Sequence, residues 1–481
     1  MIQFAFVVLG APLALLSFFR WQFGLYGLLL FLPISGAIAL WMKSTSLASF
    51  GPLLKDLFFV LPLYGGFFLF GLHQLRGVRI PWAIVLAITL LTLLALVQSA
   101  NPELFNILVA VIGLKVWLMY IPLILISAAW LTSFDRLVFT LRLLAVLTLI
   151  PTCVGLLQWV MSATIGYQTT MTMFYGAAAR AATQNFGGFN YGGEYYRIPS
   201  TFTFVSQYFS FLLAMIVPAM TLALADPHPR WRRRGWIILA LIVLAGFLCG
   251  ARSAIVMLPL IVGLVFVIDG RATGAIAAAI MLPIFLLTTL FIAGLDPLQV
   301  LGATGDLVVG YSRSIVVRGV LDSLQAYPLG LGTGMSTGPA RYALTGDESL
   351  PLIESFFAKS VVEFGVAGLI VVTILFATVI WSVFMTRRQL IHPLFRAFTA
   401  AVLAYCLLIA INSAKGAILD IDPTNVMYWF YLGLVFKLPF LESEILQRIN
   451  RERASRPRSV PQEALQPAQR GAARLKPVFG R

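Results

Sequence analysis

The chain has 481 residues, of which 60% are hydrophobic and only 11% are charged, and its mean hydropathy is +0.92. A soluble domain carries roughly twice that share of charged residues, so the composition excludes an ordinary soluble fold. The formal net charge is +15, but much of the excess lies in short loops and in the C-terminal tail, where it indicates membrane topology rather than nucleic-acid binding.

Apolar runs long enough to cross about 30 Å of hydrocarbon recur along nearly the whole chain. Lipid cannot satisfy bare backbone groups, so such runs must be helical. We therefore predict an all-α polytopic integral membrane protein with about 12–14 transmembrane helices. The expected spans are 2–19, 23–42, 53–72, 80–98, 104–131, 138–159, 202–224, 235–250, 252–268, 272–294, 357–385, 395–411 and 424–440.

The expected organisation follows from where these runs are interrupted. Its parts are N-terminal helices (1–159), a first extracytoplasmic loop (160–201), central helices (202–294), a large second extracytoplasmic loop (295–353), C-terminal helices (354–440) and a basic tail (441–481). The tail is rich in Arg, Gln, Pro and Ala and poor in aromatic residues, so we expect it to be disordered. The three cysteines all lie within apolar runs, and no metal-ligand spacing is visible.

Lysine and arginine in short loops mark the cytoplasmic side of a membrane protein. The strongest marker is the segment 230–234, which contains four arginines. Alternation of the spans then places the other basic short loops and the C-terminus on the same side. Both long loops consequently face the periplasm or the cell exterior, and so does the N-terminus.

The first long loop combines glycines, tyrosines and an arginine. Gly187 to Gly193 is followed by Tyr195, Tyr196 and Arg197, shortly before the span that begins near Phe202. Glycine lets backbone approach a ligand closely, and tyrosine offers a flat face and a hydroxyl that suit sugar rings. Arg197 is expected at the depth of a lipid phosphate. The competing interpretation of the tyrosines is a mobile loop with interfacial aromatic residues.

Arg252 lies in a turn between two apolar helices on the outward side. An unpaired charge in the centre of hydrocarbon costs about 2.5–3.5 kcal/mol or more, so Arg252 should face protein or an aqueous cavity. Cys249 to Ser253 is expected to form a tight re-entry between the two helices. Snorkelling of the side chain to the membrane interface is the alternative.

The second long loop carries Arg313 and Arg318, whose spacing places them on adjacent faces of a helix. A glycine-rich turn follows, which includes Gly332 and Gly334. It lacks a lysine and a preceding strand, so it is not a nucleotide-binding loop. Its successive N–H groups can still form an anion-binding nest.

Glu354 opens the span that follows the second loop. A carboxylate that faces an outward cavity just above an apolar helix can act as a general base. The alternative is an acidic residue that is merely favoured by the dipole at a helix N-terminus.

Taken in chain order, these elements resemble the superfamily of O-antigen ligases and Wzy-type polysaccharide polymerases. The likeness covers about 195–370 and lies in four short motifs. They are Arg197-Ile198-Pro199-Ser200-Thr201-Phe202, Ala251-Arg252-Ser253, Arg313 followed by Pro328-Leu329-Gly330-Leu331-Gly332-Thr333-Gly334, and Glu354-Ser355 followed by Glu363-x-Gly365-x-x-Gly368.

The resemblance implies a metal-independent, inverting glycosyltransferase of the GT-C type in the bacterial inner membrane, with its active site toward the periplasm and no cofactor. Its donor would be a glycan on undecaprenyl diphosphate and its acceptor another glycan. Arg252 and Arg313 would bind the diphosphate and Glu354 would be the base. Arg197, Arg318, Tyr195, Tyr196, Gly332 and Gly334 would contact substrate. Besides membrane lipids, a chain-length regulator and a flippase would be the expected partners.

Ligases of this superfamily are expected to have histidine at the position of Glu354, so the glutamate favours polymerisation of repeat units over ligation to lipid A core. Ligation remains an alternative. A lipid-linked oligosaccharide flippase would have a similar number of helices, but it predicts charges buried within several spans and pseudo-symmetric halves. A scaffold subunit of the cell envelope would offer no reason for the four motifs.

Overall fold

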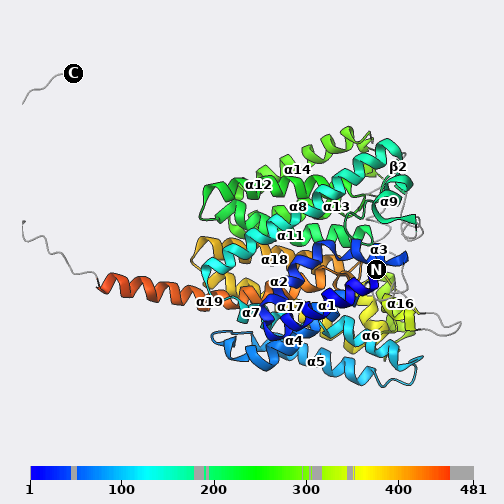
Figure 1. Cartoon of the computed structure of the whole chain (residues 1–481), viewed down its shortest axis with the longest axis horizontal. Coiled ribbons are helices and arrows are strands. Elements are labelled where there is room, and N and C mark those ends of the chain that lie inside the picture. Colours follow the sequence, from blue (N-terminus) through cyan, green and yellow to red (C-terminus); the bar gives the residue numbers. More distant parts are fainter. Residues whose placement is uncertain are drawn as a thin grey trace, which may run out of the picture.

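The computed structural model describes residues 2–44, 51, 53–177, 189–190, 194–294, 296–298, 300–302, 305, 317–343, 350–351 and 353–455. It confirms the all-α membrane-protein class (Figure 1). Within these residues, eight helices are long and apolar enough to cross a membrane, and three more apolar helices are shorter. Every predicted span coincides with one or more of the helices that the structure describes.

The first half of the chain forms helices that run back and forth between the two ends of the bundle. They are α1 (Ile2–Phe19), α2 (Trp21–Phe31), α3 (Ser35–Trp41), α4 (Leu61–Gly66) within the helical segment Asp56–Leu75, α5 (Trp82–Gln98), α6 (Ile107–Leu118), α7 (Leu123–Trp130), α8 (Phe134–Ile165) and α9 (Tyr167–Tyr175). The expected single span 104–131 is broken between α6 and α7, because Pro122 cannot continue the helical hydrogen bonding.

The second half contains the helices that carry most of the motifs. A hairpin of two short antiparallel strands, β1 (Phe189–Asn190) and β2 (Glu194–Tyr195), precedes them. The helices are α11 (Val205–Ala225), α12 (Pro229–Leu248), α13 (Ala254–Asp269), α14 (Ala272–Ile292), α16 (Gly319–Ala326), α17 (Phe356–Gln389), α18 (Pro393–Ser413) and α19 (Thr424–Ser455). The described part of the second loop therefore contains a helix, α16.

The core of the bundle lies around α11 and α18, whose side chains are mostly buried, whereas α14 lies at the edge with most of its surface exposed. Helix α18 packs against α11, α13 and α17. Two of these helices, α13 and α17, begin next to motif residues. Their packing against α18 places the ends of all three helices next to one another.

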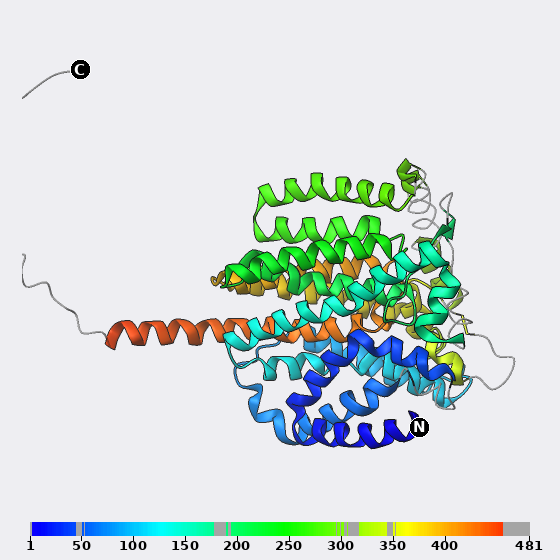
Figure 2. The ribbon, with the colours of Figure 1, turned by 45° about the horizontal axis from the view of Figure 1, so that its top comes forward.

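The described parts of the two long loops lie at one end of the bundle, near β2, α9 and α16, and α19 projects from the opposite end (Figures 1 and 2). The prediction that the tail is disordered from residue 441 is wrong for 441–455, because α19 continues without a break to Ser455. Residues 456–481 lie outside the described part. We refer below to the end that carries α9 and α16 as the loop end; that it faces the periplasm remains a prediction.

Candidate active site at the loop end

Arg197 is held in place by the turn that follows it, which is anchored inside the bundle. Ser200 adopts a positive φ of 52°, and its hydroxyl donates to the carbonyl of Pro151 in α8. The hydroxyl of Thr201 donates to the carbonyl of Pro33, which precedes α3. Ser200 is fully buried and Thr201 nearly so. The hydroxyl residues of this motif therefore fix the backbone from which the Arg197 side chain extends.

The turn that carries Arg252 packs directly on the Arg197 segment. The N–H of Ile198 donates to the carbonyl of Cys249 over 3.0 Å. Gly250 has a φ of 77°, and a Cβ there would lie 2.4 Å from the carbonyl that precedes Arg197. The predicted re-entry between α12 and α13 is thus confirmed, and only glycine fits its closest contact. Arg197 and Arg252 are both half-buried, with Cα atoms within about 12 Å of each other.

The segment that carries Tyr196 and Arg197 contacts Tyr167, a residue that the sequence analysis did not single out. The Tyr196 ring stacks parallel to Tyr167 of α9 with centroids 6.1 Å apart. The Tyr167 hydroxyl donates to the carbonyl of Arg197 over 3.1 Å. Burial raises the pKa of Tyr167 to about 12, although the positive charge of Arg197 acts in the opposite direction. Tyr195 belongs to β2, and its side chain lies outside the described part.

The glycine-rich turn of the second loop docks into a break in α17. Gly365 interrupts this helix with φ 68° and ψ −159°. The carbonyls of Val362 and Glu363, which lose their helical partners there, accept hydrogen bonds from the N–H groups of Leu331 and Gly332 at 2.8 and 3.2 Å. Two motifs that are separate in sequence therefore form one interlocked unit.

The same turn is also hydrogen-bonded to α5, in the first half of the chain. The side chain of Gln98, at the end of α5, donates to the carbonyl of Leu329 over 2.7 Å. The Thr333 hydroxyl donates to the carbonyl of Ala95 over 2.6 Å. The turn thus bridges α5 and α17.

The Glu363 carboxylate occupies the anion-binding nest that the glycine spacing suggests. Both Glu363 and its surroundings are buried. Its donors are Gly334 N at 2.7 Å, Ser336 N at 3.2 Å, Thr337 Oγ1 at 2.9 Å and Trp117 Nε1 at 2.8 Å. The N–H of Gly334 donates to this carboxylate and the N–H of Gly332 to the backbone carbonyl of Glu363, so these glycines position the turn rather than offer free donors to a substrate.

A buried lysine connects this unit to the segment between α18 and α19. Lys359 is fully buried, and its ammonium lies 2.5 Å from Asp420 and 3.9 Å from Glu363. It also lies over the Trp117 ring, 4.7 Å from the centroid. Burial raises the pKa of Asp420, and the positive charge of Lys359 opposes that rise.

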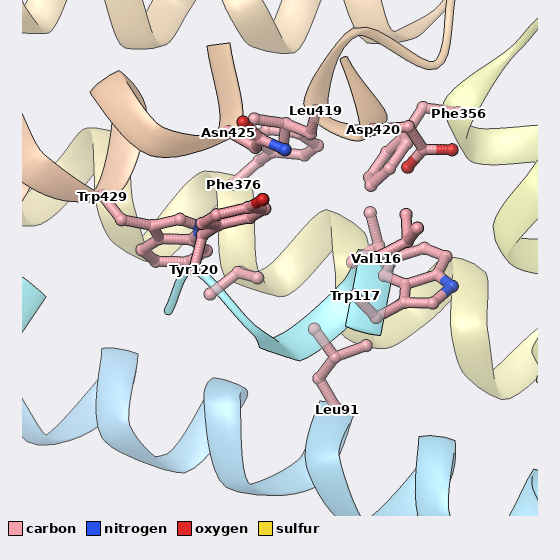
Figure 3. A pocket seen from close by; sticks show the side chains of 12 residues that line it. Leu91, Val116, Trp117, Tyr120, Phe356, Phe376, Leu419, Asp420, Asn425 and Trp429 are labelled. Carbon is pink, nitrogen blue, oxygen red and sulfur yellow. The ribbon is translucent and has the colours of Figure 1, made fainter. Parts of the chain in front are cut away.

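A small cavity adjoins these residues (Figure 3). Aromatic and aliphatic side chains line most of it, and Asp420, Asn425 and Tyr120 contribute its polar groups. Its volume is about 30 Å³, which suits one or two water molecules. It is far too small for a sugar, so a glycan must bind elsewhere.

A second buried ion cluster lies beside the first. Lys55 pairs with Asp56 at 2.7 Å and with Asp422 at 2.9 Å, and Lys115 pairs with Asp56 at 2.6 Å. Sequence reasoning missed both clusters. Their signal was present, since a lysine or an acidic residue inside an apolar run requires a partner.

The remaining predicted site residues are less enclosed. Glu354 is exposed at the loop end, and the helix cap itself is Ser355, whose hydroxyl accepts from the N–H of Ala358 over 3.3 Å. Arg318 is exposed at the start of α16. Arg313 lies outside the described residues. Among the residues that the structure does describe, no group of three His, Cys, Asp or Glu side chains is placed to hold a metal ion.

We expect Glu363→Gln to destabilise the protein by about 2 kcal/mol, because a glutamine amide would point a donor at other donors and leave Lys359 short of negative charge. Reversible unfolding of the purified protein in mixed micelles measures this change. Glu452→Gln on exposed α19 is the matched control and should change stability by at most about 0.5 kcal/mol. Equal stabilities of the two variants would contradict an anchoring role of Glu363.

No protein-family model and no curated protein matches the chain. Among solved structures, it is similar to a chain from a study titled "Structural coordination of polymerization and crosslinking by a peptidoglycan synthase complex". The two share 14% sequence identity at a TM-score of 0.39, and the match covers 75% of this chain and 97% of the other. A likeness of this strength carries no functional argument.

Proposed function

We propose that this protein is a membrane glycosyltransferase that polymerises undecaprenyl-diphosphate-linked oligosaccharide repeat units into exopolysaccharide or O-antigen on the outer face of the inner membrane. The observation that carries the proposal is the pair Arg197 and Arg252, which hydrogen-bonded and tightly packed backbone brings together at the loop end. Two half-buried guanidinium groups on a rigid backbone suit the oxygens of a diphosphate, because each presents a planar fork of donors.

In the proposed reaction, a hydroxyl of the acceptor glycan attacks C1 of the donor sugar. The bond between C1 and the diphosphate oxygen breaks, and undecaprenyl diphosphate leaves with its electron pair. Glu354 takes the proton of the attacking hydroxyl, and the configuration at C1 is inverted. Arg197 and Arg252, together with Arg313, stabilise the negative charge that develops on the leaving group.

The contacts of the second loop give Glu354 a defined position. Helix α17, which begins just after it, is tied to the glycine-rich turn at Gly365 and to Asp420 through Lys359. Glu354 itself makes no hydrogen bond within the described residues, so its carboxylate is available to a substrate. Gly332 and Gly334 support this arrangement indirectly through Glu363.

One observation favours transport as a second candidate function. Lys55, Asp56, Lys115, Lys359 and Glu363 are charged groups within or next to predicted spans, as expected of a flippase. However, each of them is paired, and the Glu363 carboxylate accepts from four donors, which is typical of a structural network. A flippase would move lipid-linked oligosaccharide across a liposome bilayer without lengthening it.

The direct test is reconstitution of the purified protein in proteoliposomes with a lipid-linked oligosaccharide. We expect glycan chains longer than one repeat unit and the release of one undecaprenyl diphosphate for each glycosidic bond formed. The activity should not change when EDTA is added. Gel electrophoresis of the glycan and chromatography of the lipid follow the two products. Translocation without chain growth would favour the flippase, and transfer of glycan only to lipid A core would favour the ligase.

A further inference from the structure

Lys415 is a cationic residue at the loop end that none of the motifs includes. It lies two residues past the end of α18, in the segment that connects this helix to α19. Its side chain is half-buried, and it makes no side-chain hydrogen bond or ion pair with any residue that the structure describes. By contrast, Lys55, Lys115 and Lys359 each pair with a carboxylate.

The helix ends place Lys415 at the same end of the bundle as two of the proposed active-site residues. Arg252 lies two residues before the start of α13, and Glu354 lies two residues before the start of α17. Helix α18 packs against both α13 and α17, and axes of packed helices are about 8–10 Å apart. The loop ends of these three helices are therefore neighbours, and Lys415 follows the loop end of the helix that packs against the other two.

The segment that carries Lys415 is also fixed in place. The N–H groups of Lys415 and Gly416 donate to the carbonyl of Asn412, at 3.1 and 2.9 Å. Further along, Asp420 binds Lys359 and Asp422 binds Lys55. Both ends of the segment are thus held, so the position of the lysine is determined by the fold and not by an exposed, unrestrained loop.

The electrostatic surroundings agree with this geometry. Burial lowers the pKa of Lys415, and the negative charge of Glu354 partly opposes this effect. Glu354 is therefore close enough to act on Lys415, although the two do not form an ion pair. A half-buried ammonium without a bound carboxylate is poorly compensated, and an anion from solution would improve its solvation.

We propose that Lys415 is a phosphate-binding residue of the active site, which contacts the diphosphate of the donor together with Arg252 and next to the base Glu354. This inference rests on the proposed function, because the diphosphate is the anion that the donor would bring to this place. When the bond between C1 and the diphosphate oxygen breaks, the ammonium would help to stabilise the leaving oxygen.

Binding of undecaprenyl diphosphate to the purified full-length protein in nanodiscs tests the assignment. We expect Lys415→Met to weaken binding by about tenfold or more and to reduce its dependence on salt, because one charge-assisted contact is lost. Lys415→Arg should bind nearly as the wild type does. Lys43→Met, which removes an exposed lysine next to α3 at the same end, is the control and should leave binding unchanged.

A second measurement needs no variant of Lys415. Undecaprenyl diphosphate should slow acetylation of the Lys415 amine in the wild-type protein and leave that of Lys43 unaffected, as measured by mass spectrometry of peptides. Unchanged acetylation, or equal affinity of wild type and Lys415→Met, would overturn the role of Lys415 while the proposed function stands. Absence of undecaprenyl diphosphate binding by the wild type would overturn both.

Discussion

We expect Glu354→Gln to lower the rate of glycosyl transfer by about 10²-fold or more, because glutamine keeps the size and polarity of the side chain but cannot accept a proton. Lipid-linked repeat units should accumulate in cells that carry the variant. The structure sharpens this prediction, since Ser355 caps α17 and Glu354 does not. If Glu354 only interacted with the helix dipole, Glu354→Gln would lower the folding stability by at most about 1 kcal/mol and would not lower the rate of transfer.

Two further variants make the result specific. Glu103→Gln removes another exposed carboxylate at the loop end, in the connection between α5 and α6, and should leave transfer unchanged. Glu354→His introduces the residue expected in ligases, and retained activity would show that either side chain can take the proton. Polymer of wild-type length and yield from Glu354→Gln would end the general-base assignment and leave only a diphosphate-binding site.

We expect Arg252→Ala to reduce transfer by about 10²- to 10³-fold, because loss of one preorganised donor to a developing negative charge has effects of that size. Lysine should restore little activity, since a point charge cannot reproduce the two parallel hydrogen bonds of a guanidinium group. The same loss is expected for Arg313→Ala. Initial rates in proteoliposomes, normalised to the amount of inserted protein, provide the measurement.

The backbone contact of the Arg252 turn does not depend on its side chain, so Arg252→Ala should insert and fold normally. Arg79→Ala, at an exposed position between the segment Asp56–Leu75 and α5, removes an equal charge far from the site and serves as the control. A folded Arg252→Ala protein with wild-type rates would refute the role of this arginine in leaving-group stabilisation.

Hydrophobic length and charge were sufficient to predict the spans, because each transmembrane helix must satisfy its backbone alone and therefore leaves a local signal. The position of the turn at Gly250 could be predicted for the same reason. The contact of this turn with Arg197 could not, since it depends on how α8, α11 and α12 pack. The resemblance to a glycosyltransferase superfamily assigned the diphosphate to Arg252 and Arg313 and a substrate contact to Arg197, but it gave no information on how close Arg197 and Arg252 lie.

The lysine pairs show what the sequence could have revealed. Lys359 and Glu363 are four residues apart in a largely apolar stretch of α17, a spacing that brings two side chains together. Their partners were beyond prediction, because Asp420 and Trp117 come from distant segments. Similarly, the helical part of the tail, 441–455, has the composition of an exposed segment but continues a helix that begins in the bundle.

The docking of the glycine-rich turn into the break at Gly365 also has a consequence for biogenesis. The turn takes two of its partners from Val362 and Glu363, which enter the membrane only after the turn itself has been synthesised. Its other anchors, at the end of α5, are inserted much earlier. The turn therefore cannot complete its hydrogen bonds until the first half of α17 has been synthesised. A nascent chain that stops before Phe356 would hold many of its helices in the bilayer, yet the turn would lack its two partners in α17.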